Sequence, residues 1–176
     1  LDLILATRDL QQNYVYLNNG NLEFQDKIPF GTGKDNTRSL NVVDINKDGI
    51  LDIITANISE QNVIYFGSKK KEFSTSLVFD TSLMNSFSLS TADIDSDNDI
   101  DIIVGNYGKP NMVFYNSQNG KRWTKKQLSK EGMNTYDIIT SDINKDGLID
   151  IIEANSDGIN RYYLNRILSI SKTKEQ

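Results

Sequence analysis

The sequence predicts an all-β fold, a β-propeller built from four-stranded blades. Three observations predict it: a long internal repeat, short segments rich in β-branched and aromatic residues, and an aspartate-rich loop at one place in every repeat. Repeats of roughly 40 to 50 residues that contain four short strands are typical of propeller blades. The 176 residues hold about 3.6 repeats of 49 residues. We therefore expect the chain to be part of a larger ring of six or seven blades.

The repeat is visible as columns of asparagine residues, each spaced at 49. The columns are Asn13, Asn62, Asn111 and Asn160; Asn36, Asn85 and Asn134; and Asn57, Asn106 and Asn155. Self-similarity over this length indicates one structural unit per repeat. It divides the single domain, residues 1–176, into an incomplete blade (1–37), two blades (38–86 and 87–135) and an incomplete or terminal blade (136–176).

Each segment within a repeat is predicted to be a strand. In the second repeat, residues 39–45 lead into the aspartate loop, residues 51–57 follow it, residues 62–67 form a third strand and residues 72–79 a weaker fourth. Asn, Gly, Asp or Ser bounds every run, as is usual for strands. The strands that flank the loop are almost continuously apolar, which predicts that neighbouring blades cover both of their faces. At the end of the chain, residues 167–176 predict only a weak strand.

A nine-residue loop with acidic or amide side chains at alternate positions recurs at residues 44–52, 93–101 and 142–150. In calcium-binding loops, positions 1, 3 and 5 place oxygens on one side of a tight turn, position 7 offers its backbone carbonyl, and a later carboxylate completes the site. Carboxylates this close repel one another unless a cation lies among them. The pattern favours calcium over magnesium, which requires a nearly octahedral set of ligands.

The expected ligands occupy the same five positions in every loop, one calcium ion for each loop and about three in all. They are Asp44, Asn46, Asp48, the Ile50 carbonyl and Asp52; Asp93, Asp95, Asp97, the Asp99 carbonyl and Asp101; and Asp142, Asn144, Asp146, the Leu148 carbonyl and Asp150. The second loop has Asn98 where the others have glycine. Asparagine tolerates the left-handed conformation expected there, so the turn should be kept.

Two other structures have loops of similar sequence. Asp and Asn side chains can bond to their own backbone in Asx-turns without a metal, but three loops in register, each ending in aspartate, favour calcium. An EF-hand requires a glutamate at position 12 between two helices. Only the third loop has it, as Glu153, and the flanking segments are short and β-branched. The EF-hand interpretation therefore fails for the set.

The composition excludes several kinds of chemistry. The chain has no cysteine and no histidine, which leaves oxygen ligands and favours hard cations such as calcium. Three divalent ions would change the formal charge of −5 to about +1. The lysine-rich stretches are short and scattered, so no nucleic-acid partner is expected. No apolar run approaches the roughly 20 residues of a membrane-spanning helix, so we expect no transmembrane segment.

These loops resemble the FG-GAP repeats of integrin alpha-subunit propellers and the related bacterial VCBS repeats. They match the motif Asp-x-(Asp/Asn)-x-Asp-Gly-x-x-Asp, and residues 16–20 followed by Phe24 are similar to the turn between the family's third and fourth strands. The resemblance implies a β-propeller, usually seven-bladed, with calcium between the first and second strands of a blade. It also implies a secreted or cell-surface protein that acts in adhesion, ligand binding or carbohydrate recognition.

We therefore expect an extracellular, calcium-stabilised binding or adhesion module, with mainly structural calcium and a protein or glycan ligand held by its loops. A lectin-type propeller is one alternative, with Tyr107 and Trp123 as stacking residues, although Trp123 fits outer-strand packing better. The non-catalytic part of a polysaccharide-degrading enzyme is another. The remainder of a larger propeller, or a second copy, would complete the ring.

Catalysis within this chain is not expected. Without histidine, nothing supports a nucleophile paired with a base. The free acids nearest the repeat junctions are Glu60, Glu131 and Glu153, and none of them recurs at the repeat spacing. We therefore expect a binding protein.

Overall fold

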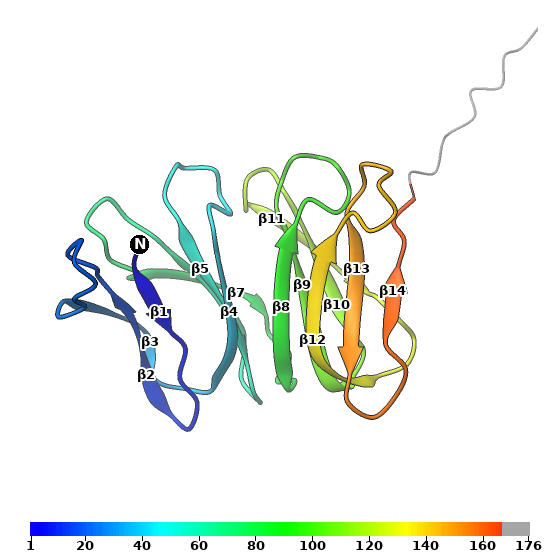
Figure 1. Cartoon of the computed structure of the whole chain (residues 1–176), viewed down its shortest axis with the longest axis horizontal. Helices are drawn as coiled ribbons and strands as arrows, with labels where there is room; N and C mark the ends of the chain where they lie inside the picture. Colours follow the sequence, from blue (N-terminus) through cyan, green and yellow to red (C-terminus); the bar gives the residue numbers. More distant parts are fainter. Residues whose placement is uncertain (167–176) are drawn as a thin grey trace, which may run out of the picture.

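The computed structural model describes residues 1–166, which form fourteen strands and no helix (Figure 1). The first two blades contain β1 (Leu3–Leu5), β2 (Gln11–Tyr16) and β3 (Lys27–Asp35), then β4 (Thr37–Val43), β5 (Asp52–Asn57), β6 (Asn62–Phe66) and β7 (Thr75–Asp80). The next two contain β8 (Ser86–Ala92), β9 (Asp101–Lys109), β10 (Met112–Ser117) and β11 (Arg122–Gln127), then β12 (Met133–Ser141), β13 (Asp150–Asn155) and β14 (Arg161–Tyr163). The weak strand predicted at 167–176 lies outside the described residues.

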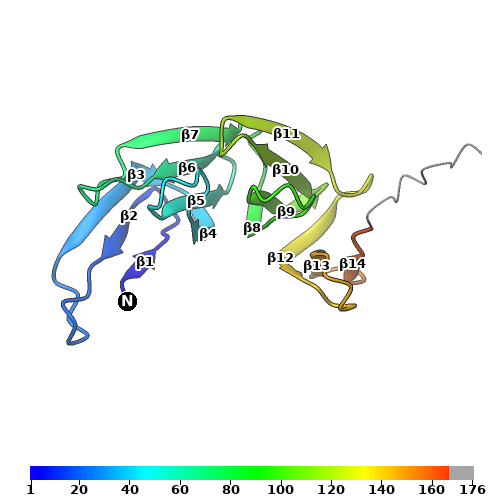
Figure 2. The same ribbon diagram turned by 90° about the horizontal axis from the view of Figure 1, so that it is seen from above.

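Each blade is an antiparallel sheet whose strands follow one another in sequence order, as in β4-β5-β6-β7. The blades form an arc, with β4, β8 and β12 on its concave side and β7 and β11 on its convex side (Figure 2). Two residue pairs, Met133 with Lys109 and Asn134 with Tyr107, also join β12 to β9 of the preceding blade. The predicted all-β propeller architecture is confirmed. No helix long and apolar enough to cross a membrane occurs in residues 1–166.

Some strand limits differ from the prediction. The strand before the first loop was predicted to reach residue 45, but β4 ends at Val43. Asp44 starts the turn there, because its carboxylate accepts hydrogen bonds from the backbone N–H groups of Asp48 and Gly49. The outer strand β7 begins at Thr75 rather than at residue 72.

The hydrophobic core lies between neighbouring blades. One cluster contains Ile54 of β5 together with Val104 and Phe114 of the next blade. Another joins Ile103 of β9 to Ile138 of β12. All six residues of β5 are buried, and so are the first six of β9. This is the burial on both faces that the continuous apolar pattern of these strands predicts.

The first asparagine column connects each blade to the next one. The side-chain amides donate across the blade boundary to a hydroxyl at 3.0 Å in three successive pairs: Asn13 to Thr37, Asn62 to Ser86, and Asn111 to Thr135. Each asparagine Oδ1 also accepts a backbone N–H from five or six residues earlier in its own blade, for example that of Asn57 at 2.8 Å from Asn62. The column therefore shapes a turn and fastens two blades together.

Replacing Asn62 with alanine should lower the free energy of unfolding by about 2–3 kcal/mol, because buried polar groups lose their partners. Asn62 is fully buried and bonds to Asn57 and Ser86. Asn160→Ala is the matched control, since Asn160 is exposed and within residues 1–166 bonds only to the Asn155 N–H. Urea unfolding in calcium should show a loss below about 1 kcal/mol for the control. Equal losses for both variants would contradict a blade-to-blade role.

Candidate metal centres

The three aspartate loops lie along the same edge of the blades, at the top of the view in Figure 1. Each connects the first strand of a blade to the second: β4 to β5, β8 to β9, and β12 to β13. Residues Val43 and Asp52 pair directly beside the first loop, and Ser141 and Asp150 pair beside the third. The repeat therefore places chemically similar loops side by side on one face.

Hydrogen bonds to the first residue of each loop define the turn. The Asp44 carboxylate accepts from the backbone N–H groups of Asp48 at 3.0 Å and Gly49 at 2.8 Å. Asp93 and Asp142 accept from the corresponding groups in their own loops. These hydrogen bonds span four and five residues, whereas the bond of an Asx-turn spans two. They leave acceptor capacity free, since an ionised carboxylate has about four lone-pair sites.

Two positions in each loop adopt the left-handed backbone conformation. In the first loop they are Lys47, with φ of 59°, and Gly49, with φ of 85°. In the second they are Ser96, with φ of 61°, and Asn98, with φ of 72°. The prediction that Asn98 keeps the turn in place of glycine is confirmed.

The ninth loop residue fastens the loop to the blade. Asp52, Asp101 and Asp150 are fully buried. Asp101 accepts hydrogen bonds from the backbone N–H groups of Ile94, in its own loop, and Asn116, in β10, both at 2.8 Å. Asp52 and Asp150 accept the corresponding pairs of N–H groups. Each carboxylate therefore joins the loop to the third strand of the blade or to a residue just after that strand.

Burial changes the acidity of these carboxyl groups in the metal-free chain. Desolvation raises the pKa of Asp101 to about 7, and the nearby Asp95 and Asp97 add to the rise while the two backbone N–H groups oppose it. Burial also raises the pKa of Asp52 and that of Asp95, which is the less buried of the two. Carboxyl groups crowded and desolvated in this way gain from a nearby cation.

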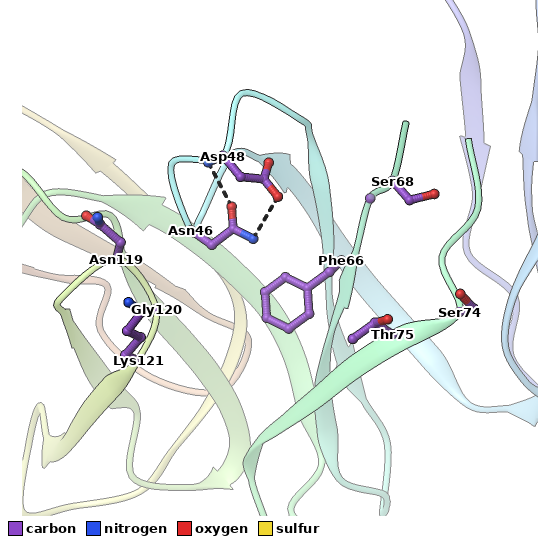
Figure 3. Close-up of a pocket in the computed structure, with 10 residues that line it drawn as sticks. Asn46, Asp48, Phe66, Ser68, Ser74, Thr75, Asn119, Gly120 and Lys121 are labelled. Atoms are coloured by element: carbon purple, nitrogen blue, oxygen red, sulfur yellow. Dashed lines mark hydrogen bonds between the residues drawn. The ribbon is translucent and has the colours of Figure 1, made fainter. Parts of the chain in front are cut away.

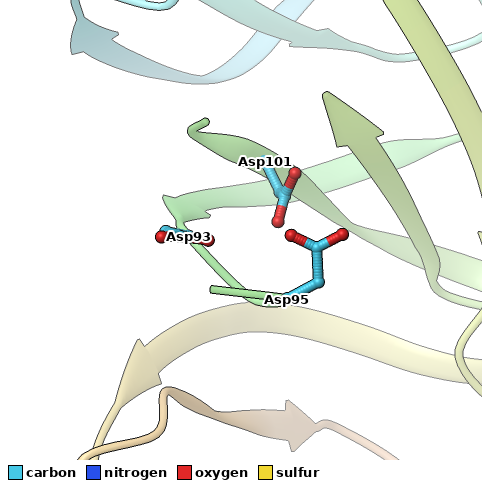
Figure 4. A group of neighbouring side chains, drawn as sticks. All are labelled: Asp93, Asp95 and Asp101. Carbon is cyan, nitrogen blue, oxygen red and sulfur yellow. The ribbon is translucent and has the colours of Figure 1, made fainter. Parts of the chain in front are cut away.

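The second loop brings three carboxylates together. One oxygen each from Asp93, Asp95 and Asp101 lies within 4.8 Å of the other two (Figure 4). Two oxygens bound to one calcium ion at the usual 2.3–2.6 Å are at most about 5 Å apart. These three residues could therefore hold a metal ion. Asp97 lies outside this group, and its Oδ1 accepts the Asp99 N–H at 2.8 Å.

In the first and third loops the third position is an amide. Asn46 donates to the Asp48 carboxylate at 3.2 Å, and Asn144 donates to the Asp146 carboxylate at 2.9 Å. The side chains at positions 3 and 5 are thus neighbours, as a common ligand set requires. The complete ligand sets, including the carbonyls of Ile50, Asp99 and Leu148, stay predictions.

Residues of the following blade also contact the aspartate loops. Lys47 of the first loop forms an ion pair with Asp99 of the second at 2.7 Å, and the hydrogen bond from Lys47 holds the pKa of Asp99 below its usual value. The Asn116 side chain donates to the Ile45 carbonyl at 3.1 Å, in the loop of the preceding blade. Asn165 donates to the Ile94 carbonyl in the same manner, at 2.6 Å. The conformation of one loop therefore depends on the next blade.

Open cavities border the first two loops. A cavity of about 490 Å³ lies between the first loop and the β10–β11 turn, with Asn46 and Asp48 on one side and Lys121 on the other (Figure 3). A second cavity, of about 380 Å³, is lined by Asp95, Asp97 and Tyr115. Solvent ions therefore have direct access to both loops.

Glu153, the residue that resembles an EF-hand ligand, has a different role. Its side chain is fully buried and accepts hydrogen bonds from the Asn111 amide at 2.8 Å and the Tyr163 hydroxyl at 3.1 Å. Arg161 lies 3.8 Å from it and 3.4 Å from Glu131. The loops of residues 1–166 connect strands rather than helices. The structure therefore agrees with rejecting the EF-hand interpretation.

The two aromatic residues considered as sugar-stacking groups lie in different surroundings. Trp123 packs against the core cluster of the second and third blades, and its indole N–H donates to the Gly120 carbonyl at 3.1 Å. Trp123 is therefore a packing residue of the outer strand. Tyr107 stacks on Phe87, with 5.1 Å between ring centroids.

A family model described as FG-GAP-like repeat matches the chain three times, over residues 1–55, 44–104 and 93–153. The chain belongs to the FG-GAP-like repeat family. Successive FG-GAP matches share an aspartate loop, so one repeat runs from one loop to the next. Repeats of the FG-GAP family form propeller-type binding modules. No curated protein matches the chain.

Proposed function

We propose that this chain is a calcium-stabilised binding module that acts outside the cell or at its surface and has no catalytic activity of its own. The observation that carries the proposal is the group of Asp93, Asp95 and Asp101, whose oxygens have the spacing of a common ligand set. It lies in an FG-GAP repeat, and the same loop recurs in the neighbouring blades. The ligand is a protein or a glycan, held by loops between strands.

Calcium in this proposal is structural. An ion in the second loop would neutralise carboxylates that burial and mutual repulsion disfavour, and would hold Asp101 against β10. Sites in extracellular modules typically bind calcium at about 10⁻⁴–10⁻³ M. Sites of that affinity would fill where calcium is abundant, as it is outside the cell.

Calorimetric titration of the metal-free protein tests the proposal. We expect saturable uptake of about three calcium ions, and weaker binding of magnesium because it requires a stricter geometry. Asp95→Asn should remove or weaken one site. Asp9→Asn, which changes an exposed acid outside the loops, is the control and should bind as the wild type does. Absence of saturable calcium uptake would refute the proposal.

A carbohydrate ligand, in a lectin-type module or in the non-catalytic part of a polysaccharide-degrading enzyme, is the second candidate. The cluster of Phe87, Tyr107 and Tyr136 favours this candidate. It lies at the edge of the blades opposite the aspartate loops. Further blades, from a larger propeller or from a second copy, would complete the ring in either case.

A further inference from the structure

We propose that the concave side of the arc carries a binding site for an acidic oligosaccharide. The site lies at the edge of the blades opposite the aspartate loops. The site consists of Arg8, Arg38, Phe87, Tyr107 and Tyr136, here called the bulge row. The inference deepens the proposed binding function and rests on it, because it names the ligand class and the residues that hold the ligand.

The backbone explains why three of these side chains, those of Arg38, Phe87 and Tyr136, project from the sheets. In the second, third and fourth blades the first strand has a register shift, between Thr37 and Ser39 in β4 and at the corresponding places in β8 and β12. The extra residue is Arg38, Phe87 or Tyr136. A bulge leaves one residue unpaired and re-aims its side chain. Because these residues are 49 apart in the sequence, they occupy equivalent positions in three consecutive blades.

The location is set by the strand pairing. In the second blade, Thr37 pairs with Asn57, whereas Val43 at the other end of β4 pairs with Asp52 beside the metal loop. The bulges therefore lie at the end of the blades away from the loops. β4, β8 and β12 line the concave side (Figure 2), so the row follows that side from blade to blade.

The side chains of the row contact one another. The Arg38 guanidinium lies 5.6 Å from the centre of the Phe87 ring. Tyr107 stacks on Phe87 at 5.1 Å, and Tyr136 meets Phe87 edge to face at 5.3 Å. Tyr136 is 47% exposed, and Phe87 and Tyr107 are half-buried. The row therefore presents aromatic surface to solvent beside a cation.

The two arginines give the row its charge. Arg8 and Arg38 line a hollow of about 290 Å³ together with Ala6 and Thr37. In the part of the chain that the structure describes, neither arginine forms an ion pair; the ion pairs there involve Lys47, Lys125 and Arg161. Guanidinium groups bind carboxylate and similar oxyanions through paired hydrogen bonds. Two of them at one hollow, in a chain of charge −5, favour an anionic ligand.

The acidic residues next to the row in the sequence, Asp9 after Arg8 and Asp137 after Tyr136, form no ion pair with the two arginines within residues 1–166. Asp137 follows Tyr136, and its carboxylate accepts hydrogen bonds from the Ser88 hydroxyl at 2.7 Å and from the Ile138 N–H at 2.9 Å. It therefore lies within the contact between β8 and β12 and does not neutralise the arginines. A ligand anion would have Arg8 and Arg38 as partners.

An oligosaccharide fits this combination better than a peptide. Sugar rings present C–H faces that stack on aromatic rings, and their hydroxyl groups can bond to the phenol groups of Tyr107 and Tyr136. The hollow is near the lower limit of about 300 Å³ for small-molecule sites, and only Ala6 among its lining residues is apolar. It suits one acidic sugar unit, with adjoining units lying along the aromatic rings.

Calorimetry with the calcium-loaded protein tests the site. The probes are tetrasaccharides of alternating glucuronate and N-acetylglucosamine, their sulfated counterparts, and, as the neutral probe, the unsulfated compound with every carboxylate methyl-esterified. We expect the acidic probes to bind at least tenfold more tightly than the neutral one, and Arg38→Gln to weaken this binding at least tenfold. Tyr136→Ala should weaken it at least fivefold. Arg122→Gln, on the exposed outer strand β11, is the matched control and should change nothing.

Three results would overturn the inference: no acidic probe binds at about 1 mM, neutral and acidic probes bind equally, or Arg38→Gln has no effect. Equal or tighter binding of a tetraglutamate peptide ending in phenylalanine would overturn the glycan assignment. The melting temperature of the same samples, with calcium and with chelator, separates this inference from the proposed function. If calcium raises the melting temperature but no glycan binds, only the bulge-row site is wrong. If glycans bind but calcium has no effect, the structural role of calcium is wrong.

Discussion

Replacing Asp101 with alanine is expected to destabilise the protein both with and without calcium. Asp101 is fully buried, and its two oxygens accept the N–H groups of Ile94 and Asn116. Alanine leaves both donors without a partner, at a cost of about 2–4 kcal/mol in chelator. In calcium at a hundred times the dissociation constant, the second loop should lose about 2.7 kcal/mol more. Chemical unfolding in chelator and in calcium measures the two losses separately.

Asp97→Asn is the matched control for this variant. Asp97 is exposed, and an asparagine oxygen can still accept the Asp99 N–H. The control should therefore be as stable as the wild type in chelator, and should lose stability only in calcium. If Asp101→Ala behaved in the same way, the role of Asp101 in joining the loop to β10 would be wrong.

The blade architecture could be predicted from the sequence because similarity recurs at a fixed spacing. The strands around each loop carry continuous apolar runs, and β5 and β9 are buried as those runs predict. The turn at Asn98 could be predicted as well, because few residues other than glycine tolerate its φ of 72°. These features depend on local chemistry, which the sequence displays directly.

Contacts between blades could not be predicted in the same way. The asparagine columns were visible, but nothing in the sequence shows that Asn62 donates to Ser86, which is 24 residues further along the chain. The role of Glu153 was hidden for the same reason, because its partner Asn111 is 42 residues away. Such pairs form only when two blades pack together, so the repeat spacing alone does not reveal them.

The bulge row was missed for another reason. Arg38, Phe87 and Tyr136 share the 49-residue spacing, but their side chains differ in chemistry, so no column of similar residues marks them. Their common feature is the register shift of the strand that contains them. A sequence search for spacing without regard to residue type would have aligned the three positions, although not their contacts.

The metal-free protein is expected to become less stable as the pH rises from about 5 to about 7.5. Burial raises the pKa of Asp101 from 3.8 to about 7. Between these values the folded chain binds a proton that the unfolded chain has released, so folding is favoured at the acidic end. The free energy of unfolding should fall by up to about 1.4 kcal/mol per pH unit for this one group. Unfolding in chelator at several pH values measures the slope, and Asp101→Asn should reduce it.

Saturating calcium should remove this dependence, because the ion displaces the proton from the same carboxylate, which is then ionised in the folded chain as it is in the unfolded chain. With a pKa of about 7 for Asp101, only about a tenth of the second loops are ionised at that position at pH 6. The affinity of this loop for calcium should therefore be about tenfold lower at pH 6 than at pH 8. Calorimetry in buffers of different ionisation enthalpy should detect the released proton. An affinity that does not change with pH would show that Asp101 is already ionised in the metal-free fold, and that the ion does not relieve its burial.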